Sequence, residues 1–315
     1  MKDLRIVFFG TPDFAVASLK ALVDGGFKVV AAVTAIDKPS GRGHKMQSPP
    51  VKLFVDEHNI PCLQPPNLKS ESFVQELQGF EADLQIVVAF RMLPEIVWNM
   101  PPLGTYNVHA SLLPDYRGAA PINWAIINGE KLTGVTTFKL QHQIDTGNIL
   151  FQQPVEIKES DNAGTLHDKL MEAGAELLIR SVTAIASGPV ALKPQQDGGS
   201  KEAPKIFKDT CQIDWNLPAS KVRDFIRGMS PFPTSYAKVV LEDGSKENWK
   251  IYDSSLTQHC CTSPGLLKIL DGKLLISCID HWLEINELQS PGKKRMKAEE
   301  FLRGLRFDLD TIKLE

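Results

Sequence analysis

Residues 4–34 read LRIVFFGTPDFAVASLKALVDGGFKVVAAVT, and this stretch decides the fold class. The run 4–10 is apolar, does not alternate and ends in Gly, which is typical of a strand buried on both faces. An amphipathic stretch with Pro12 near its start follows, and 27–34 is a second apolar run. The order strand, helix, strand predicts a βαβ unit with parallel strands.

The same alternation continues through the first half of the chain. Apolar runs at 84–90 and 104–110 predict further strands, and 121–130 predicts a helix. Runs at 134–140 and 149–157 could extend or edge the sheet, and a helix from about Ala163 to Ala186 closes the pattern. We therefore predict an α/β fold with a doubly wound, mostly parallel sheet.

The composition and the apolar pattern of the sequence change after residue 186. Residues 187–205 are rich in Pro, Gly, Ser and Gln and carry no apolar period, so they predict a linker. Short strand-like runs separated by turn signals follow, and they predict a small barrel or sandwich. A chain of 315 residues is long enough for two domains. We expect a domain at 1–189, a linker at 190–207 and a second domain at 208–315.

Composition excludes several classes of protein. The chain is 43% hydrophobic and 23% charged with a formal net charge of −3, so its bulk charge does not indicate a nucleic-acid binder. No apolar run is long enough to cross a membrane. The five Cys lack CxxC spacing and the seven His lack metal-ligand spacing, so we expect reduced thiols and no metal site. These observations predict a cytoplasmic protein.

Two loops have sequences that bear on ligand binding. The turn FFGTPDFA at 8–15 has neither G-x-G-x-x-G nor a P-loop Lys, which argues against NAD and ATP. Residues 37–52, DKPSGRGHKMQSPPVK, predict a structureless insertion with several cationic side chains. This loop is either simply solvated or contacts an RNA backbone through phosphates, and its residues alone leave both readings open.

Residues 107–118, NVHASLLPDYRG, carry the strongest chemical signal. Strand alternation puts Asn107 and His109 on one face, at the carboxyl end of a parallel strand where α/β sheets bind ligands. An amide beside an imidazole can polarise a carbonyl and move a proton. A structural role for His109 is the alternative. Asp145, in QHQIDTGNI, is either an ordinary turn residue or a carboxylate that reaches His109.

Taken together, these segments resemble the formyltransferases that use 10-formyltetrahydrofolate. The resemblance covers nearly the whole chain and rests on FGTPDFA (9–15), DKPSGRG (37–43), NVHASLLPDYRGAAPINWAI (107–126), DTG (145–147), IDW (213–215) and SPFPTSY (230–236). It implies a Rossmann-like catalytic domain followed by a small C-terminal β-barrel resembling an OB-fold, which binds tRNA. The implied reaction moves the formyl group from N10 of the co-substrate to the α-amino group of methionine on the initiator tRNA. The resemblance implies no metal, and we expect a monomer.

The resemblance also assigns roles to residues. Asn107 and protonated His109 would stabilise the oxyanion of formyl transfer, while Asp145 would orient His109 and help take a proton. The folate-binding stretch would comprise Ser111, Leu112, Leu113 and Pro114. Arg42 would meet the acceptor stem of the initiator tRNA, with Lys38 and Lys45 in the same loop. Arg91 and Gln143 depart from the family pattern, which usually has Gly near both positions.

Three other functions compete with this interpretation. One is a folate-dependent formyltransferase acting on glycinamide ribonucleotide or an amino sugar nucleotide, although the former would leave the C-terminal domain unexplained. Another is a 10-formyltetrahydrofolate hydrolase, which would not need the cationic loop. The last is a catalytically silent module that binds RNA or folate, against which Asn107, His109 and Asp145 argue.

Overall fold

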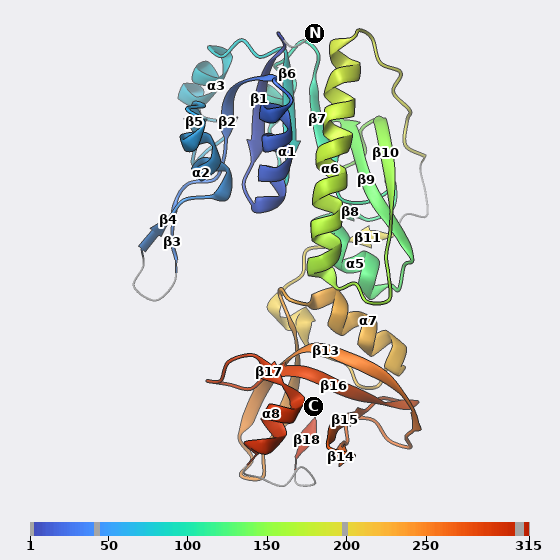
Figure 1. Cartoon of the computed structure of the whole chain (residues 1–315). Helices are drawn as coiled ribbons and strands as arrows, with labels where there is room; N and C mark the ends of the chain where they lie inside the picture. The colour runs from blue at the N-terminus through green and yellow to red at the C-terminus, as the bar shows by residue number, and fades with distance from the viewer. Residues whose placement is uncertain (1–2, 41–44, 197–200, 306–311, 315) are drawn as a thin grey trace. The chain divides into compact units, whose positions relative to one another are not determined.

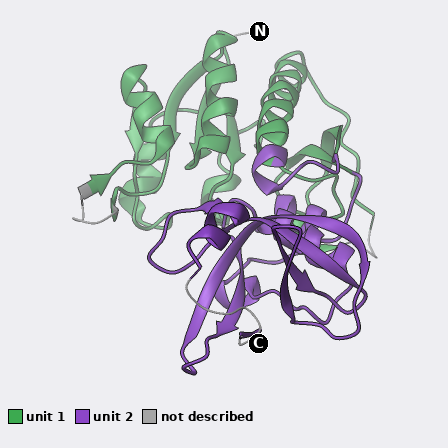
Figure 2. Cartoon of the chain, turned by 60° about the horizontal axis from the view of Figure 1, so that its bottom comes forward, with its two compact units in different colours: residues 1–118, 132–156, 167–202 green, residues 119–131, 157–166, 203–315 purple. Residues whose placement is uncertain are grey.

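The computed structural model describes residues 3–40, 45–196, 201–305 and 312–314. The chain divides into two compact units (Figure 2), each built from several segments. Unit 1 comprises residues 1–118, 132–156 and 167–202, and unit 2 comprises residues 119–131, 157–166 and 203–315.

Unit 1 is built on one seven-stranded sheet (Figure 1) in the order β10-β9-β7-β6-β1-β2-β5. Neighbouring strands from β7 to β5 pair in parallel, whereas β9 pairs antiparallel with β7 and β10 antiparallel with β9. The predicted mostly parallel α/β sheet is therefore confirmed, and the runs at 134–140 and 149–157 do edge it. The strands are β1 (Arg5–Gly10), β2 (Lys28–Val33), β5 (Cys62–Leu63), β6 (Leu84–Val88), β7 (Thr105–His109), β9 (Leu132–Lys139) and β10 (Ile149–Glu156).

Burial explains why the central strands lack alternation. Residues 6–9 of β1 are each 0% exposed, because helices cover both faces of a doubly wound sheet. The helices whose residues lie wholly or mostly in unit 1 are α1 (Asp13–Asp24), α2 (Pro50–Glu57), α3 (Glu71–Gln78), α4 (Glu95–Trp98) and α6 (Ala163–Ala186). The bounds of α6 are those expected from the sequence.

Helix α6 determines which face of β7 is left for chemistry. A Cβ placed at Gly174 of α6 would lie only 3.3 Å from Cγ1 of Val108, so the helix backbone packs closely on that side of the strand. Because successive side chains point to opposite faces, Asn107 and His109 lie on the other side.

The segment 37–52 is not structureless, and this expectation was wrong. Strand β3 (Lys38–Ser40) pairs antiparallel with β4 (Lys45–Gln47), and Pro39 lies opposite Met46. In Figure 1 this hairpin projects away from the sheet of unit 1. Pro39, one of the residues that suggested an irregular loop, lies in β3, and no other described strand pairs with this two-stranded ribbon, which is compatible with Pro at that position.

Unit 2 contains the predicted C-terminal β domain. Its sheet runs in the order β14-β15-β16-β13-β12-β18, with β17 beside β16, and its described pairs are antiparallel. The sheet curls into a half-barrel (Figure 1), which agrees with the small barrel expected from the sequence. The strands are β12 (Ser235–Val240), β13 (Lys246–Cys260), β14 (Leu267–Leu270), β15 (Lys273–Ser277), β16 (His281–Gln289), β17 (Met296–Lys297) and β18 (Lys313–Leu314).

Helices pack on this curled sheet. Trp249 on β13 is 1% exposed and meets Phe301 edge to face at 4.9 Å between ring centroids. The helical segments wholly in unit 2 are α5 (Pro121–Ile127), the 3₁₀ turn η1 (Lys208–Cys211), α7 (Ala219–Met229) and α8 (Ala298–Arg303). The two remaining strands are short. Strand β8 (Arg117–Gly118) belongs to unit 1, and the two residues of β11 (Glu202–Ala203) are divided between unit 1 and unit 2.

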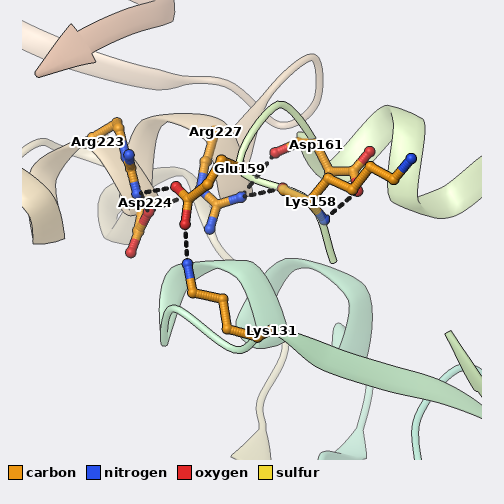
Figure 3. A network of polar contacts seen from close by, with 7 residues as sticks. All are labelled: Lys131, Lys158, Glu159, Asp161, Arg223, Asp224 and Arg227. Carbon is orange, nitrogen blue, oxygen red and sulfur yellow. Dashed lines mark hydrogen bonds and ion pairs between the residues drawn. The ribbon is translucent and has the colours of Figure 1, made fainter. Parts of the chain in front are cut away.

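A polar network joins three segments of unit 2 (Figure 3). Nε of Arg227 on α7 donates to Oδ1 of Asp224 at 2.8 Å, and its Nη1 donates to the carbonyl of Asp161 at 3.0 Å. Both side chains are almost fully buried. Glu159 accepts from Lys131 and pairs with Arg223, and the hydrogen bond from Lys131 lowers the pKa of Glu159. The buried part of this network fixes α7 to residues 158–161.

Candidate active site

The candidate site lies at the carboxyl end of β7, within unit 1. Strand β7 lies between β6 and β9, with Asn107 opposite Val87 on one side and Phe138 on the other. Asn107 is half-buried and His109 is only 7% exposed. Asn107 and His109 lie two residues apart on β7, on the face opposite Val108.

His109 is held by a backbone carbonyl. Its Nε2 lies 2.8 Å from the carbonyl oxygen of Tyr116, whose φ of 60° turns the chain back after the strand. Because a carbonyl only accepts, Nε2 carries the hydrogen of this bond. The other ring nitrogen, Nδ1, is therefore the one left for proton exchange.

Asp145 reaches the histidine. Its Oδ2 lies 3.9 Å from Nδ1 of His109 and accepts the backbone N–H of Gly118 at 3.0 Å. The distance is an ion-pair distance and too long for a hydrogen bond. The carboxylate is 13% exposed, so little solvent screens the pair. The arrangement places a carboxylate beside the ring nitrogen that the Tyr116 carbonyl leaves free.

A tight turn places Asp145 beside the strand. Asp145 has a φ of 54°, in the left-handed region that Asp tolerates better than most residues. A Cβ at Gly147 would overlap the carbonyl oxygen of Lys139, so only Gly fits at that position of the DTG sequence.

Gln195 was missed by the sequence analysis. Its Nε2 donates to the carbonyls of Asp145 at 2.9 Å and Gly147 at 2.8 Å, and its Oε1 accepts from Nη2 of Arg117 at 2.6 Å. Gln195 therefore ties the Asp145 turn to the segment that follows β7. It lies in the predicted linker, where composition alone gave no signal for a site residue.

The stretch 111–114 forms a rigid corner beside the site. Ser111 is fully buried, its hydroxyl donates to the carbonyl of Asp115 at 2.6 Å, and its own carbonyl accepts from Oγ1 of Thr136 at 2.6 Å. Gln152 donates to the carbonyl of Leu113 at 2.9 Å, and the Leu113 side chain is buried against Phe138 and Ile149. Leu112 is partly exposed, and the Leu113–Pro114 bond is cis. The corner is held by internal contacts, independently of a ligand.

The cationic residues of the 37–52 segment are described in part. Lys38 lies on β3 with an exposed side chain, and the backbone of Lys45 belongs to β4. Arg42 lies outside the described residues. Arg91, which departs from the family pattern, donates from Nη1 to the backbone carbonyl of Pro66 at 3.2 Å. Its guanidinium is therefore bound to neighbouring backbone.

Metal ligation and membrane spanning are the next two properties that the described residues bear on. Within them, no group of three or more His, Cys, Asp or Glu side chains could hold a metal ion. The helices in those same ranges are also too short or too polar to cross a membrane.

Comparison with known proteins accounts for both parts of the chain. The family model described as formyl transferase matches residues 4–182, and the model of the formyl transferase C-terminal domain matches residues 205–306. The chain belongs to the formyl transferase family. The first match contains the whole Asn107, His109 and Asp145 cluster.

Curated relatives match this formyl transferase along nearly its whole length. The chain is 53% identical over 311 residues to methionyl-tRNA formyltransferase of Bacteroides thetaiotaomicron, covering 97% of each protein. It is 46% identical over 311 residues to methionyl-tRNA formyltransferase of Flavobacterium johnsoniae, covering 98% of each.

Solved structures share the fold of this formyl transferase at lower identity. WlaRD, a sugar 3N-formyl transferase, has a TM-score of 0.64 at 19% identity and covers 92% of this chain and 99% of its own. HypX from Aquifex aeolicus in complex with tetrahydrofolic acid also has a TM-score of 0.64, at 17% identity, covering 97% of this chain and 48% of its own. At such identities the likeness supports the fold alone.

Proposed function

We propose that this formyl transferase moves the formyl group of 10-formyltetrahydrofolate to the α-amino group of methionine on the initiator tRNA, for translation initiation. The observation that carries the proposal is 53% identity, along nearly all of both chains, to a methionyl-tRNA formyltransferase. The described geometry supports it, since an amide, an imidazole and a carboxylate meet at the carboxyl edge of the sheet. Serving translation initiation would place the protein in the cytoplasm.

The first chemical step is attack of the amine on the formyl carbon. A carbon–nitrogen bond forms, the carbonyl π electrons move to oxygen, and the resulting oxyanion needs hydrogen-bond donors. Asn107 can supply its side-chain N–H, because no other described group in this part of the chain hydrogen-bonds that amide. One such donor is typically worth about 3 kcal/mol in the transition state.

The second requirement is proton transfer. The attacking amine must lose a proton, and N10 of the folate must gain one as its bond to the formyl carbon breaks. Nδ1 of His109, with Asp145 at 3.9 Å, is the group we assign to this exchange, while the Tyr116 carbonyl keeps the ring oriented through Nε2. A protonated His109 would also donate to the oxyanion.

Substrate binding is assigned to two further segments. Ser111, Leu112, Leu113 and Pro114 form the corner proposed to hold the folate, supported by its rigid attachment to Thr136 and Gln152. Arg42, Lys38 and Lys45 are proposed to contact the tRNA backbone from the β3–β4 hairpin.

We also propose that the domains of the chain have separate roles. Residues 1–189 would carry catalysis, 190–207 would link, and 208–315 would form an OB-like tRNA-binding domain in a monomer. The family matches at 4–182 and 205–306 support this division.

Formylation of charged tRNA tests the proposal. The protein, 10-formyltetrahydrofolate and initiator methionyl-tRNA should yield formylmethionyl-tRNA, with much slower product formation on elongator methionyl-tRNA. Release of formate at the same rate with and without tRNA, and without formylmethionine, would favour a hydrolase instead.

A further inference from the structure

Three polar side chains lie in series on the curled sheet of unit 2. Cys260 ends β13 and lies opposite His281, the first residue of β16, in the antiparallel register. The Sγ atom of Cys260 is 3.7 Å from Nε2 of His281, and Nδ1 of His281 is 3.3 Å from Oδ2 of Asp280. A thiol, an imidazole and a carboxylate therefore follow one another in series.

Asp280 is held in place and charged. Its Oδ1 accepts the backbone N–H of Ala219, at the start of α7, and that of His281, each at 2.8 Å. Although burial opposes ionisation, these backbone hydrogen bonds hold the pKa of Asp280 below its usual range. The fixed carboxylate favours a hydrogen on Nδ1 of His281, which leaves Nε2 to accept a proton from the thiol.

Cys260 differs from the other thiols of the chain. It is exposed, whereas Cys211 and Cys278 are buried and Cys62 and Cys261 are partly buried. Burial raises the pKa of each of those four thiols, and that of Cys278 rises to about 12. Cys261 also donates its S–H to the carbonyl of Cys278 at 2.8 Å. Among the five thiols, Cys260 alone combines solvent access with an oriented base.

We propose that Cys260 is a modification site, at which peroxides oxidise a thiol that His281 and Asp280 activate. The thiol proton passes to Nε2 of His281, and the thiolate attacks one oxygen of hydrogen peroxide. A sulfur–oxygen bond forms as the oxygen–oxygen bond breaks. The departing hydroxide takes the proton back from His281 and leaves as water. Sulfur is oxidised to a sulfenic acid while the peroxide is reduced.

Trapping of the sulfenic acid tests the proposal on the full chain. The protein is treated with one equivalent of hydrogen peroxide in the presence of dimedone, and labelled peptides are quantified over time by mass spectrometry. The label should appear first on Cys260 and should be absent from Cys260→Ser. His281→Gln should slow Cys260 labelling by about tenfold or more, because thiolate character sets the rate.

A matched control separates activation from exposure. His259 precedes Cys260 on the same strand and is exposed, and its described hydrogen bond runs from its backbone N–H to Thr257, so His259→Gln should leave the labelling rate unchanged. Alkylation by iodoacetamide should show the same order of rates. The proposal is overturned if another cysteine is labelled first, or if His281→Gln reacts as fast as the unchanged protein. Near-ultraviolet circular dichroism confirms that each variant is folded.

Discussion

Nδ1 of His109 lies 3.9 Å from Oδ2 of Asp145, although the histidine ends β7 and the aspartate lies in the turn that follows β9. In the antiparallel register β9 ends opposite Tyr106, near the start of β7, so the turn after β9 folds back to bring Asp145 to His109. The opposite ring nitrogen is bound by the Tyr116 carbonyl, so the ring has one orientation.

Replacing Asn107 tests its role as an oxyanion donor. Asn107→Ala should lower kcat by about 10²–10³-fold, since one donor of this kind is lost. Binding of initiator tRNA should stay nearly unchanged, because the side chain is assigned to the transition state. Steady-state formylation and a separate tRNA-binding titration measure the two effects. A variant that mainly loses tRNA affinity would contradict the assignment.

Gln195 tests whether the predicted linker supports the catalytic turn. Gln195→Ala removes hydrogen bonds to the carbonyls of Asp145 and Gly147, each worth about 1 kcal/mol, so kcat should fall by about tenfold or more. Gln196, the exposed neighbour, offers the matched control, and Gln196→Ala should behave as the unchanged protein. The KM for tRNA should be similar in all three. Equal kcat values for the two variants would remove Gln195 from the site.

The polar network of unit 2 predicts two very different stability effects (Figure 3). Arg227→Leu removes the nearest donor of the buried Asp224 carboxylate, which keeps Arg223 at 2.9 Å. It also removes the donor of the Asp161 carbonyl, so it should lower the free energy of unfolding by about 3 kcal/mol. Lys131→Ala removes an exposed ion pair and should cost about 1 kcal/mol or less. Urea unfolding of the full chain, followed by Trp fluorescence, compares them. Similar losses for both would mean that burial does not govern the network.

Changes in the β3–β4 hairpin should alter the KM for tRNA and leave the KM for the folate co-substrate unchanged. Arg42→Ala and Lys38→Ala should each raise the KM for initiator tRNA and make tRNA binding less steeply dependent on salt, because each is expected to remove a phosphate contact. Lys20→Ala, on the exposed surface of α1, is the control and should change neither constant. If both hairpin variants keep the KM for tRNA, the hairpin lies outside the recognition surface.

Sequence pattern predicted what depends on local periodicity. The bounds of α6 follow from a period of 3.6 residues and the common face of Asn107 and His109 from a period of 2, whereas the unbroken apolar run of β1 predicted its burial. The hairpin at 38–47 was missed because backbone pairing, rather than side-chain period, holds it. Gln195 and the Tyr116 carbonyl were missed for a related reason. Both act through hydrogen bonds to distant backbone, which no spacing in the sequence encodes.

The most direct test of the account is a single-turnover measurement of formyl transfer by Asp145→Asn. The amide can still accept the Gly118 N–H but lacks the charge beside His109. With enzyme in excess over initiator methionyl-tRNA and saturating 10-formyltetrahydrofolate, the rate of formylmethionyl-tRNA formation should fall by about 10²–10⁴-fold. The tRNA dissociation constant should stay within about twofold of the unchanged protein. A single-turnover rate equal to that of the unchanged protein would contradict the claim that the His109 and Asp145 pair carries the proton transfer.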